Sequence, residues 1–584
     1  MGPAPAGFGP GILLAGGGVP RRHKLVSICK LRFDLQTPIR CPNPASGPPR
    51  ARYNHHVISI SSDPTPLDPA ACERALGARD ARFDGLFFVG ITTTRIYCRP
   101  VCPARVSYSS HRRFFDSAAS AELAGFRPCL RCRPELAPGR AQVDAVPRLA
   151  RVAAQCIEAG ALNGRGVAHL AADLGVSERH LRRALERELG VSPLELAQTH
   201  RLLLAKRLLA DTTLSVTRIA FASGFQSLRR FNTAFRERYR LSPSAVRRAP
   251  RSTTPRTPPT QPGMDLVRLT LAYRPPLAWE ELIGCLRREA LPGVELVDGE
   301  RYGRTVWLGG RAGVVFASDA ASVESGRSRS RPTHLNVDLS TSLLPVLMPL
   351  LARLRQLFDL DAQPSVVDQH LEQGGLGPLV SRRPGLRLPG ALDGFEVCLG
   401  LLLRGEEGAG WRGDPAGRVI EALGEPIATG IPGLARLAPT PERIAGLGAA
   451  GLSALGVPTP RAEAIAAVAR SMASGTLRFD PRSDATATHR ALTAIDGIDE
   501  RLATLIVMRA LSWPDAFPAS DPVLQRAAGA SAAPPLLRLA EQWRPWRAYA
   551  AHHLWLKDEG EPSLVSASRY SSPGAVPPAA GDKA

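Results

Sequence analysis

Two stretches of the chain place apolar side chains at the spacing of amphipathic helices. In residues 167–189 the pattern predicts a helix, a turn at Gly175 and a second helix that begins after the N-cap residue Ser177. Apolar residues recur at every fourth position of the second helix and predict a buried face: Leu181, Leu185 and Leu189. The opposite face of that helix is basic: Arg179, Arg182 and Arg183.

The same pattern returns 49 residues later, where Gly224 takes the place of Gly175. Three apolar side chains of the following helix are predicted to point inward: Leu228, Phe231 and Phe235. The outward positions are again polar: Arg229, Arg230, Asn232 and Arg236. A glycine between two amphipathic helices is common, so either stretch alone is weak evidence, but two copies favour a tandem helix-turn-helix domain.

Stretches rich in Gly and Pro divide the chain into segments. Residues 1–62 have no usable periodicity and predict a disordered or mis-started extension, residues 249–263 predict a linker, and residues 558–584 predict a tail. We therefore expect a compact domain at 63–140, a helical domain at 141–248 and a longer region at 264–557. The longer region contains strand-like runs, but its composition alone indicates no class of enzyme.

Positive charge is concentrated in the N-terminal part of the chain. The 584 residues hold 74 Lys and Arg against 53 Asp and Glu. Residues 1–251 carry 39 basic and 18 acidic side chains, whereas residues 252–584 carry 35 of each. The N-terminal part is therefore the candidate for binding a polyanion. An apolar content of 44% excludes a wholly disordered protein.

The sequence favours a chain in a reducing compartment. It has no run of 18 or more apolar residues, which excludes a membrane-spanning helix. The early apolar patch at 11–14 precedes its positive charges, Arg21 and Arg22, which is the wrong order for a secretory signal. We expect a cytoplasmic, nucleoid-associated bacterial protein, in which clustered cysteines indicate metal binding or chemistry before disulfides.

Four of the ten cysteines fall in two close pairs. Three residues separate Cys98 from Cys102, two separate Cys129 from Cys132, and 26 residues lie between the pairs. This spacing fits a tetrahedral zinc ion held by four thiolates. Closed four-thiolate sites usually only stabilise a fold, so the spacing alone favours a structural zinc site.

The residues around these cysteines resemble the N-terminal domain of the Ada adaptive-response proteins. The resemblance covers about 70 residues and rests on TTTRIYCRPVCPAR at 92–105 and GFRPCLRC at 125–132. It implies that one Zn²⁺ is held by all four thiolates. It also implies that Cys98 accepts a methyl group irreversibly from a methylphosphotriester in DNA, in a single turnover.

The implied chemistry is physically reasonable. A thiolate is the nucleophilic form of cysteine, and zinc keeps it deprotonated at neutral pH. Zinc with four thiolates has a formal charge of minus two, and methylation of one sulfur reduces it to minus one. After transfer, neighbouring arginines should therefore bind phosphate more strongly: Arg99, Arg105, Arg127, Arg131 and Arg133.

The tandem helix-turn-helix region, ending in YRLSP at 239–243, resembles the AraC-type DNA-binding domain over about 100 residues. That resemblance implies that the second helix of each unit enters a major groove, so that both polar faces contact DNA. A triester sensor directly upstream suggests a transcription activator driven by alkylation damage. Its partners would be double-stranded promoter DNA, alkylated DNA and RNA polymerase.

Three later stretches resemble the AlkA type of 3-methyladenine DNA glycosylase, in the helix-hairpin-helix superfamily, over about 290 residues: RPGLRLPG at 383–390, DAFPASD at 515–521 and WRPWRAYA at 543–550. The resemblance implies a small mixed-sheet domain at 264–350 and an all-α helix-hairpin-helix domain at 351–557. It makes Asp521 the catalytic carboxylate, and Trp555 can stack on the flipped-out cationic base. Taken alone, Asp521 is more simply a helix N-cap and Trp555 a core aromatic residue.

Two absences indicate a monofunctional glycosylase. No lysine occurs between Lys206 and Lys557, whereas strand-cleaving relatives form a Schiff base through a lysine amine. The region also lacks the four cysteines of an iron-sulfur motif.

Other positions depart from the glycosylase pattern. The hairpin keeps Gly497, but Asp499 stands where a second glycine is expected and adds a carboxylate where a DNA phosphate should sit. An expected aromatic residue appears as Leu505. Residues 404–415 do not show the helix start that carries the DNA-intercalating segment in the family.

These patterns together predict a multidomain α+β protein: a small four-cysteine zinc α/β domain, an all-α tandem helix-turn-helix domain and a glycosylase-like half. The first hypothesis is one chain that detects alkylation damage, induces repair genes and excises alkylated purines. The alternatives are a transcription regulator with a catalytically impaired glycosylase-like module, and a zinc-stabilised AraC-type activator without methyl transfer.

Overall fold

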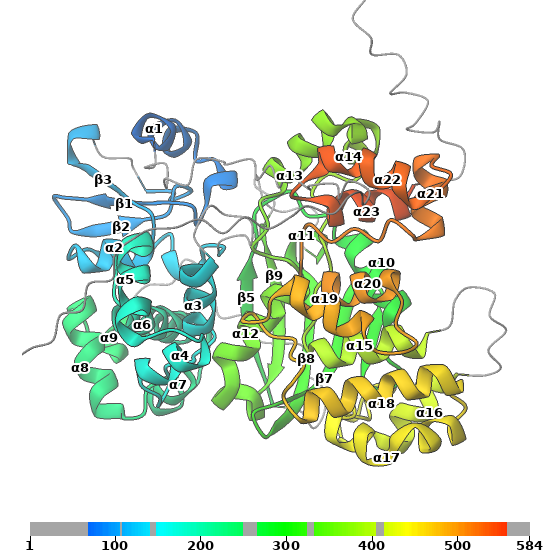
Figure 1. The fold of residues 1–584 in the computed structure, drawn as a ribbon. Coiled ribbons are helices and arrows are strands. Elements are labelled where there is room, and N and C mark those ends of the chain that lie inside the picture. Colours follow the sequence, from blue (N-terminus) through cyan, green and yellow to red (C-terminus); the bar gives the residue numbers. More distant parts are fainter. Residues whose placement is uncertain are drawn as a thin grey trace, which may run out of the picture. The chain divides into compact units, whose positions relative to one another are not determined.

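The computed structural model describes residues 68–104, 108–139, 148–248, 265–323, 332–404 and 414–557 (Figure 1). The extension, linker and tail predicted from the sequence lie outside the described residues, and so does most of the anomalous segment at 404–415. None of the described helices is long and apolar enough to cross a membrane.

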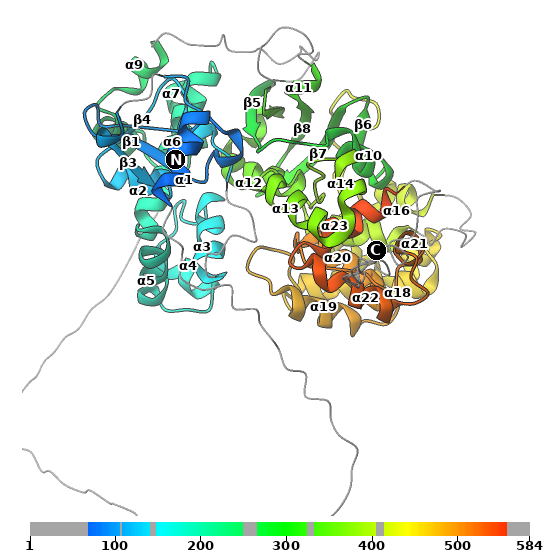
Figure 2. The same ribbon diagram turned by 90° about the horizontal axis from the view of Figure 1, so that it is seen from above.

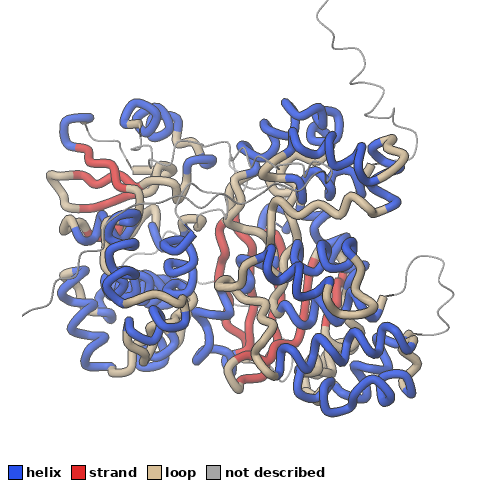
Figure 3. Tube along the Cα trace, in the orientation of Figure 1, coloured by secondary structure: helices blue, strands red, loops and turns tan. Residues whose placement is uncertain are grey.

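Residues 68–139 form a small α/β domain around a four-stranded sheet of order β3-β1-β2-β4 (Figure 3). Strand β1 pairs antiparallel with β2 and β3, and β4 pairs parallel with β2. The elements are α1 (Pro69–Ala78), β1 (Phe88–Ile91), β2 (Ile96–Cys98), β3 (Arg112–Phe115), α2 (Ala118–Leu123) and β4 (Arg127–Pro128). Tyr97 of β2 lies opposite Pro128 of β4. Because the two strands run in the same direction, the next residues of the two chain segments, Cys98 at the end of β2 and Cys129 directly after β4, lie side by side.

Seven helices make up residues 148–248, as the apolar pattern predicts. They are α3 (Arg148–Glu158), α4 (Val167–Asp173), α5 (Glu178–Leu189), α6 (Pro193–Asp211), α7 (Val216–Ala222), α8 (Leu228–Tyr239) and α9 (Pro243–Arg248). Ser177 caps α5 by accepting a hydrogen bond from the amide of His180 at 3.2 Å. Of the predicted inward residues, Leu181, Leu185, Phe231 and Phe235 are completely buried, Leu189 is largely buried and Leu228 is half-buried. Both predicted helix-turn-helix units are therefore present.

The next region contains a five-stranded antiparallel sheet of order β5-β9-β8-β7-β6. Its strands are β5 (Leu266–Ala272), β6 (Glu295–Asp298), β7 (Arg301–Leu308), β8 (Arg311–Asp319) and β9 (His334–Ser340). Helices α10 (Trp279–Glu289) and α12 (Leu347–Leu357) share one hydrophobic core with the sheet, while the short α11 (Ala320–Val323) follows β8 (Figure 2). Sheet and helix are combined here as expected, and every strand pair is antiparallel.

The remaining described residues are helical and form two groups, each with its own core (Figure 1). The first group is α15 (Gly394–Leu403), α16 (Pro415–Leu423), α17 (Pro441–Ala454), α18 (Thr459–Ala473), α19 (Ala485–Thr493) and α20 (Glu500–Ala510). The second is α13 (Pro364–Leu371), α14 (Gly377–Arg382), α21 (Pro522–Ala528), α22 (Ala533–Ala540) and α23 (Arg547–Trp555). Helices α19 and α20 are the two arms of the predicted hairpin.

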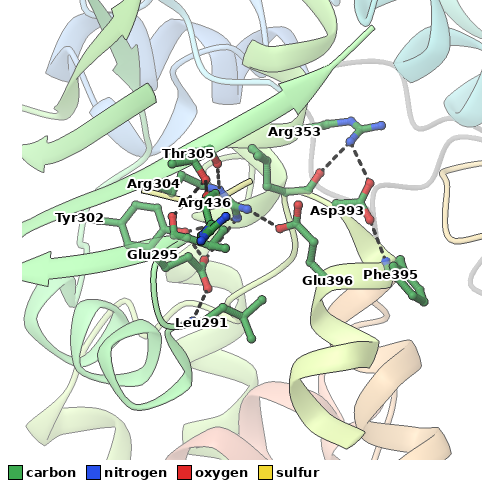
Figure 4. A network of polar contacts seen from close by, with 12 residues as sticks. Leu291, Glu295, Tyr302, Arg304, Thr305, Arg353, Asp393, Phe395, Glu396 and Arg436 are labelled. Atoms are coloured by element: carbon green, nitrogen blue, oxygen red, sulfur yellow. Dashed lines mark hydrogen bonds and ion pairs between the residues drawn. The ribbon is translucent and has the colours of Figure 1, made fainter. Parts of the chain in front are cut away.

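A buried ionic network joins the sheet to α15 (Figure 4). The side chain of Arg304 on β7 is 2% exposed, lies 3.2 Å from Glu295 and pairs with Glu396 of α15. Burial raises the pKa of Glu396 to about 7, although Arg304 opposes that shift. The network makes α15 part of the same folded unit as the sheet.

Candidate functional site

The four predicted metal ligands meet in one place, and we call them the Cys98 cluster: Cys98, Cys102, Cys129 and Cys132. Their sulfur atoms all lie within 4.8 Å of one another. All four residues are largely buried, with exposed fractions of 9, 6, 8 and 7% in that order. Cys98 lies at the end of β2.

The backbone around the cluster favours thiolates. The amide of Arg99 donates to Cys132 Sγ at 3.4 Å, and the amide of Arg131 donates to Cys129 Sγ at 3.4 Å. Hydrogen bonds from neighbouring cysteines lower the pKa of Cys129, whereas hydrogen bonds to them raise the pKa of Cys132. A donor set of four cysteine sulfur atoms this close together fits zinc, and the cluster is the site of one Zn²⁺.

Only part of the predicted phosphate-binding surface is available. Arg99 donates through Nε to Asp84 Oδ1 at 2.8 Å, and its side chain is only 11% exposed. Arg133 pairs with Glu135 and with Asp211, and its side chain is 15% exposed. The prediction for these two arginines is wrong, because buried carboxylates already hold them. Arg131 is exposed, Arg127 is half-buried, and Arg105 lies outside the described residues.

A fully buried glutamate next to this site was missed by the sequence analysis. Glu122 accepts hydrogen bonds from the hydroxyls of Tyr97 and Thr199, each at 3.0 Å, and forms an ion pair with Arg238. Burial raises the pKa of Glu122, with Arg238 opposing the shift. Tyr97 directly precedes Cys98, Thr199 belongs to α6 and Arg238 to α8. A polar contact path therefore runs from the Cys98 cluster to the second helix-turn-helix unit.

Lys206 of α6 makes a second such contact. Its ammonium group donates to the carbonyl oxygen of Cys129 at 3.3 Å and forms a buried ion pair with Glu135. The sequence held one compositional signal for it, because Lys206 is the single lysine between Lys30 and Lys557. The partners are about 70 or more residues apart in sequence, so no local pattern pairs them.

The predicted DNA-contacting faces are open to solvent. On α5 and α8 the exposed basic side chains are Arg179, Arg182, Arg183, Arg229, Arg230 and Arg236, and Asn232 is half-buried. Arg182 also donates to Glu178 at 2.8 Å on the surface of α5. The arrangement leaves both polar faces accessible, and their contact with DNA stays a prediction.

In the C-terminal half, three residues form what we call the Asp521 cluster: Asp521, Arg501 and Trp555. Asp521 is 3% exposed and caps α21, because its Oδ1 accepts the amides of Val523 and Leu524 at 3.0 Å each. Trp555 Nε1 donates to the same oxygen at 3.3 Å, and Arg501 Nε donates to Oδ2 at 2.8 Å. The N-cap interpretation of Asp521 is confirmed. The structure also brings Asp521 and Trp555 together, as the glycosylase resemblance requires.

The hairpin between α19 and α20 is formed as predicted, with Gly497 in the left-handed region at φ +85°. A Cβ atom at this position would lie 2.8 Å from the carbonyl oxygen of Pro460, so a side chain is excluded sterically as well. Asp499 caps α20, since its Oδ1 accepts the amide of Leu502 at 2.7 Å. The amide of Leu502 at the start of α20 therefore already has a carboxylate as its partner. This agrees with the prediction that Asp499 adds a carboxylate where a DNA phosphate should sit.

A well-formed cavity among the described residues lies away from the Asp521 cluster. It has a volume of about 920 Å³, and its lining includes Arg353, Trp513 and Trp546 but neither Asp521 nor Trp555.

Comparison with known proteins identifies three segments. Residues 71–135 match the metal-binding domain of Ada, residues 170–249 match a helix-turn-helix domain, and residues 268–393 match the AlkA N-terminal domain. A probable bifunctional transcriptional activator/DNA repair enzyme AlkA of Mycobacterium tuberculosis is 35% identical over 489 residues, which are 83% of this chain and 95% of the relative. This chain belongs to the same family of bifunctional transcriptional activator/DNA repair enzymes.

Other members of the comparison match parts of this bifunctional chain. DNA-3-methyladenine glycosylase 2 of Escherichia coli is 31% identical over 293 residues, 50% of this chain and 98% of the relative. The bifunctional transcriptional activator/DNA repair enzyme Ada of Escherichia coli is 33% identical over 153 residues, 25% of this chain and 40% of the relative. The Ada and AlkA resemblances are therefore confirmed, whereas the exact domain boundaries and the roles of single residues stay predictions.

Proposed function

We propose that this chain senses alkylated DNA through Cys98, activates transcription in response and excises alkylated purines at Asp521. The observation that carries the proposal is the Cys98 cluster. Four sulfur atoms within 4.8 Å of one another give a zinc site, and one of the four ligands is the cysteine that the Ada resemblance makes the methyl acceptor. The names of the bifunctional relatives support the combination of regulation and repair in one chain.

Methyl transfer requires little from the protein beyond an accessible thiolate. A bound zinc ion would keep the four sulfur atoms deprotonated at neutral pH. Cys98 Sγ then attacks the methyl carbon of a methylphosphotriester, a sulfur–carbon bond forms and the carbon–oxygen bond breaks. The electron pair of the broken bond stays on the phosphate oxygen, which restores a normal diester. A neutral triester can approach the anionic cluster, whereas an ordinary diester is repelled.

The transfer would act as a switch because it removes one negative charge from the cluster. Arg131 is exposed next to Cys132 and would then hold DNA phosphate more strongly. The polar faces of α5 and α8 would bind promoter DNA in successive major grooves. Recruitment of RNA polymerase, and action at the bacterial nucleoid in the cytoplasm, belong to this proposal.

Excision would take place at the Asp521 cluster. The Asp521 carboxylate stabilises positive charge on the sugar as the N-glycosidic bond breaks and the electron pair leaves with the base. Water then adds to the sugar carbon through its oxygen, and the proton that it loses passes to the solvent. Trp555, whose indole contacts the same carboxylate, would stack on the flipped-out base. The lack of lysine between Lys206 and Lys557 supports hydrolysis without strand cleavage.

The sensor proposal is tested by peptide mass spectrometry after incubation with DNA that contains methylphosphotriesters. We expect one added methyl group on the Cys98 peptide of the zinc-loaded protein. Cys72 is a matched internal control, because burial raises the pKa of its thiol to about 11 and it should stay unmodified. Damage-dependent transcription that persists in Cys98→Ala would contradict the proposal and support a purely structural zinc site.

The glycosylase proposal is tested by release of 3-methyladenine from methylated DNA by the wild-type chain and by Asp521→Asn. Asparagine caps helices as well as aspartate does, so the variant should keep the start of α21 while losing the charge. We expect the rate of release to fall on the order of 100-fold. Equal rates in the two proteins would contradict the assignment of Asp521.

A second candidate function is regulation alone, with a glycosylase-like module that no longer excises bases. Two observations favour it. Asp499 accepts a hydrogen bond from the amide of Leu502 at the hairpin, and Arg501 donates a hydrogen bond to Asp521 Oδ2. Complete absence of Asp521-dependent release would support this alternative.

A further inference from the structure

Arg501 holds the carboxylate that the proposed excision needs. It lies in the first turn of α20, directly after the hairpin, and its side chain is 32% exposed, whereas that of Asp521 is 4% exposed. Arg501 Nε donates to Asp521 Oδ2 at 2.8 Å. A guanidinium group therefore lies between the buried carboxylate and the solvent.

The other carboxylate oxygen is fully used. Asp521 Oδ1 accepts the amides of Val523 and Leu524 and the indole of Trp555. Within the described part of the chain, Oδ2 has Arg501 as its one hydrogen-bond partner. Any group that approaches the carboxylate must therefore do so beside Arg501, or displace it.

The next turn of α20 adds an aliphatic side chain to the same face of the helix. Leu505 follows Arg501 by four positions, so the two side chains lie one above the other, and Leu505 is half-buried. This face presents a cation and an aliphatic group in place of aromatic rings. Among Arg501, Leu505 and Trp555, the indole alone offers a π surface to a cationic base.

We propose that Arg501 is a specificity-determining residue that shifts the glycosylase away from cationic alkylated purines and towards neutral damaged purines. This inference rests on the proposed excision at Asp521. A fixed positive charge beside Asp521 repels a base that already carries a positive charge, whereas a neutral base is not repelled and gains negative charge as it leaves. Arg501 also neutralises Asp521 in the resting enzyme, which affects both kinds of substrate alike.

The inference is tested with the full zinc-loaded chain and two DNA duplexes. One contains a single 7-methylguanine, which is cationic, and the other a single hypoxanthine, which is neutral. Single-turnover rate constants are measured for the wild type, Arg501→Gln and Arg501→Lys. We expect Arg501→Gln to raise the ratio of cationic to neutral excision about tenfold, and Arg501→Lys, which keeps the charge, to leave that ratio near the wild-type value.

The ratio of cationic to neutral excision shows whether Arg501 determines specificity or has only a structural role. If Arg501 only supports α20 or only orients Asp521, both substrates change by the same factor and the ratio stays constant, which overturns the inference. Arg490→Gln, on the exposed face of α19, controls for the general loss of one positive charge near the hairpin. A wild type that releases 7-methylguanine but no hypoxanthine would also overturn it.

Failure of the proposed excision at Asp521 would give a different result from failure of the inference about Arg501. Asp521→Asn is included on both duplexes, and absence of Asp521-dependent release from either one overturns the excision proposal and this inference with it. Asp521-dependent release with an unchanged ratio overturns the role of Arg501 alone. If Arg501→Gln unfolds in a thermal melt, Arg501→Met is used, because it keeps the aliphatic stem without the charge.

Discussion

The Cys98 cluster and the Asp521 cluster both keep negative charge largely buried, but they balance it differently. Around the cysteines, the nearby cations Arg99 and Lys206 are already paired with Asp84 and Glu135. The thiolates therefore depend on a metal ion from outside the chain. Asp521 is balanced from within by Arg501. We therefore expect removal of zinc to abolish methyl transfer at the Cys98 cluster, whereas substitution of Arg501 should change the substrate preference at the Asp521 cluster.

Removal of zinc should give the largest difference between the two regions. Structural zinc sites contribute on the order of 10 kcal/mol to folding, so a chelator or Cys132→Ser should unfold residues 68–139. Hydrogen exchange followed by mass spectrometry should show lost protection there and unchanged protection at α20 and α21. The Cys72→Ser variant is the control: its substitution lies outside the Cys98 cluster, so the protein should still bind zinc. Equal loss of protection in both regions would break the comparison.

Glu122 tests whether the zinc-binding half also depends on an internal ion pair. Glu122→Gln leaves Arg238 without its buried partner, and we expect a loss of roughly 3 kcal/mol in the free energy of unfolding. Glu178→Gln breaks the exposed pair with Arg182 and should cost less than about 1 kcal/mol. Urea unfolding of both variants gives the two numbers. Similar values for the two would mean that Glu122 is not stabilised by its pair.

Features that depend on local spacing could be predicted from the sequence. The helix pairs at 167–189 and 219–239 needed only apolar periodicity and turn glycines, and the metal site needed only two cysteine pairs that a parallel strand pair brings together. Glu122, Lys206 and Arg501 were missed as site residues, because their partners lie far away in sequence. Arg99 was misjudged for the same reason, since Asp84 lies 15 residues away in sequence. Arg133 is held both by Asp211, which is distant in sequence, and by Glu135, which is only two residues away.

The buried network at β7 and α15 offers a test by pH. Burial raises the pKa of Glu396 from 4.5 to about 7. A raised folded-state pKa means that the stabilisation by protonated Glu396 is fully present below pH 4.5 and is lost as the pH rises towards 7. Glu396→Gln stays neutral, so the stability of the wild type should fall relative to this variant across that range.

The expected change is on the order of 2 kcal/mol, measured by urea unfolding at several pH values. Glu421 pairs with Arg436 on the surface, where its side chain is 70% exposed, so Glu421→Gln should show little pH-dependent difference from the wild type. A flat difference for Glu396→Gln would show that Arg304 keeps Glu396 charged. The internal cation would then balance this carboxylate as fully as Arg501 is expected to balance Asp521.

Asp499→Gly should have the smallest effect on stability, and it tests whether Asp499 weakens the binding of DNA to the hairpin. Glycine replaces an N-cap at a cost of only a few tenths of a kcal/mol, so α20 should persist. The amide of Leu502 loses its carboxylate partner, and one negative charge leaves the hairpin, so affinity for undamaged duplex DNA should rise about fivefold at low salt. Thr440→Gly removes the cap of α17 away from the hairpin and serves as the matched control. Fluorescence anisotropy at two salt concentrations measures both variants, and equal affinities would mean that the hairpin does not face phosphate.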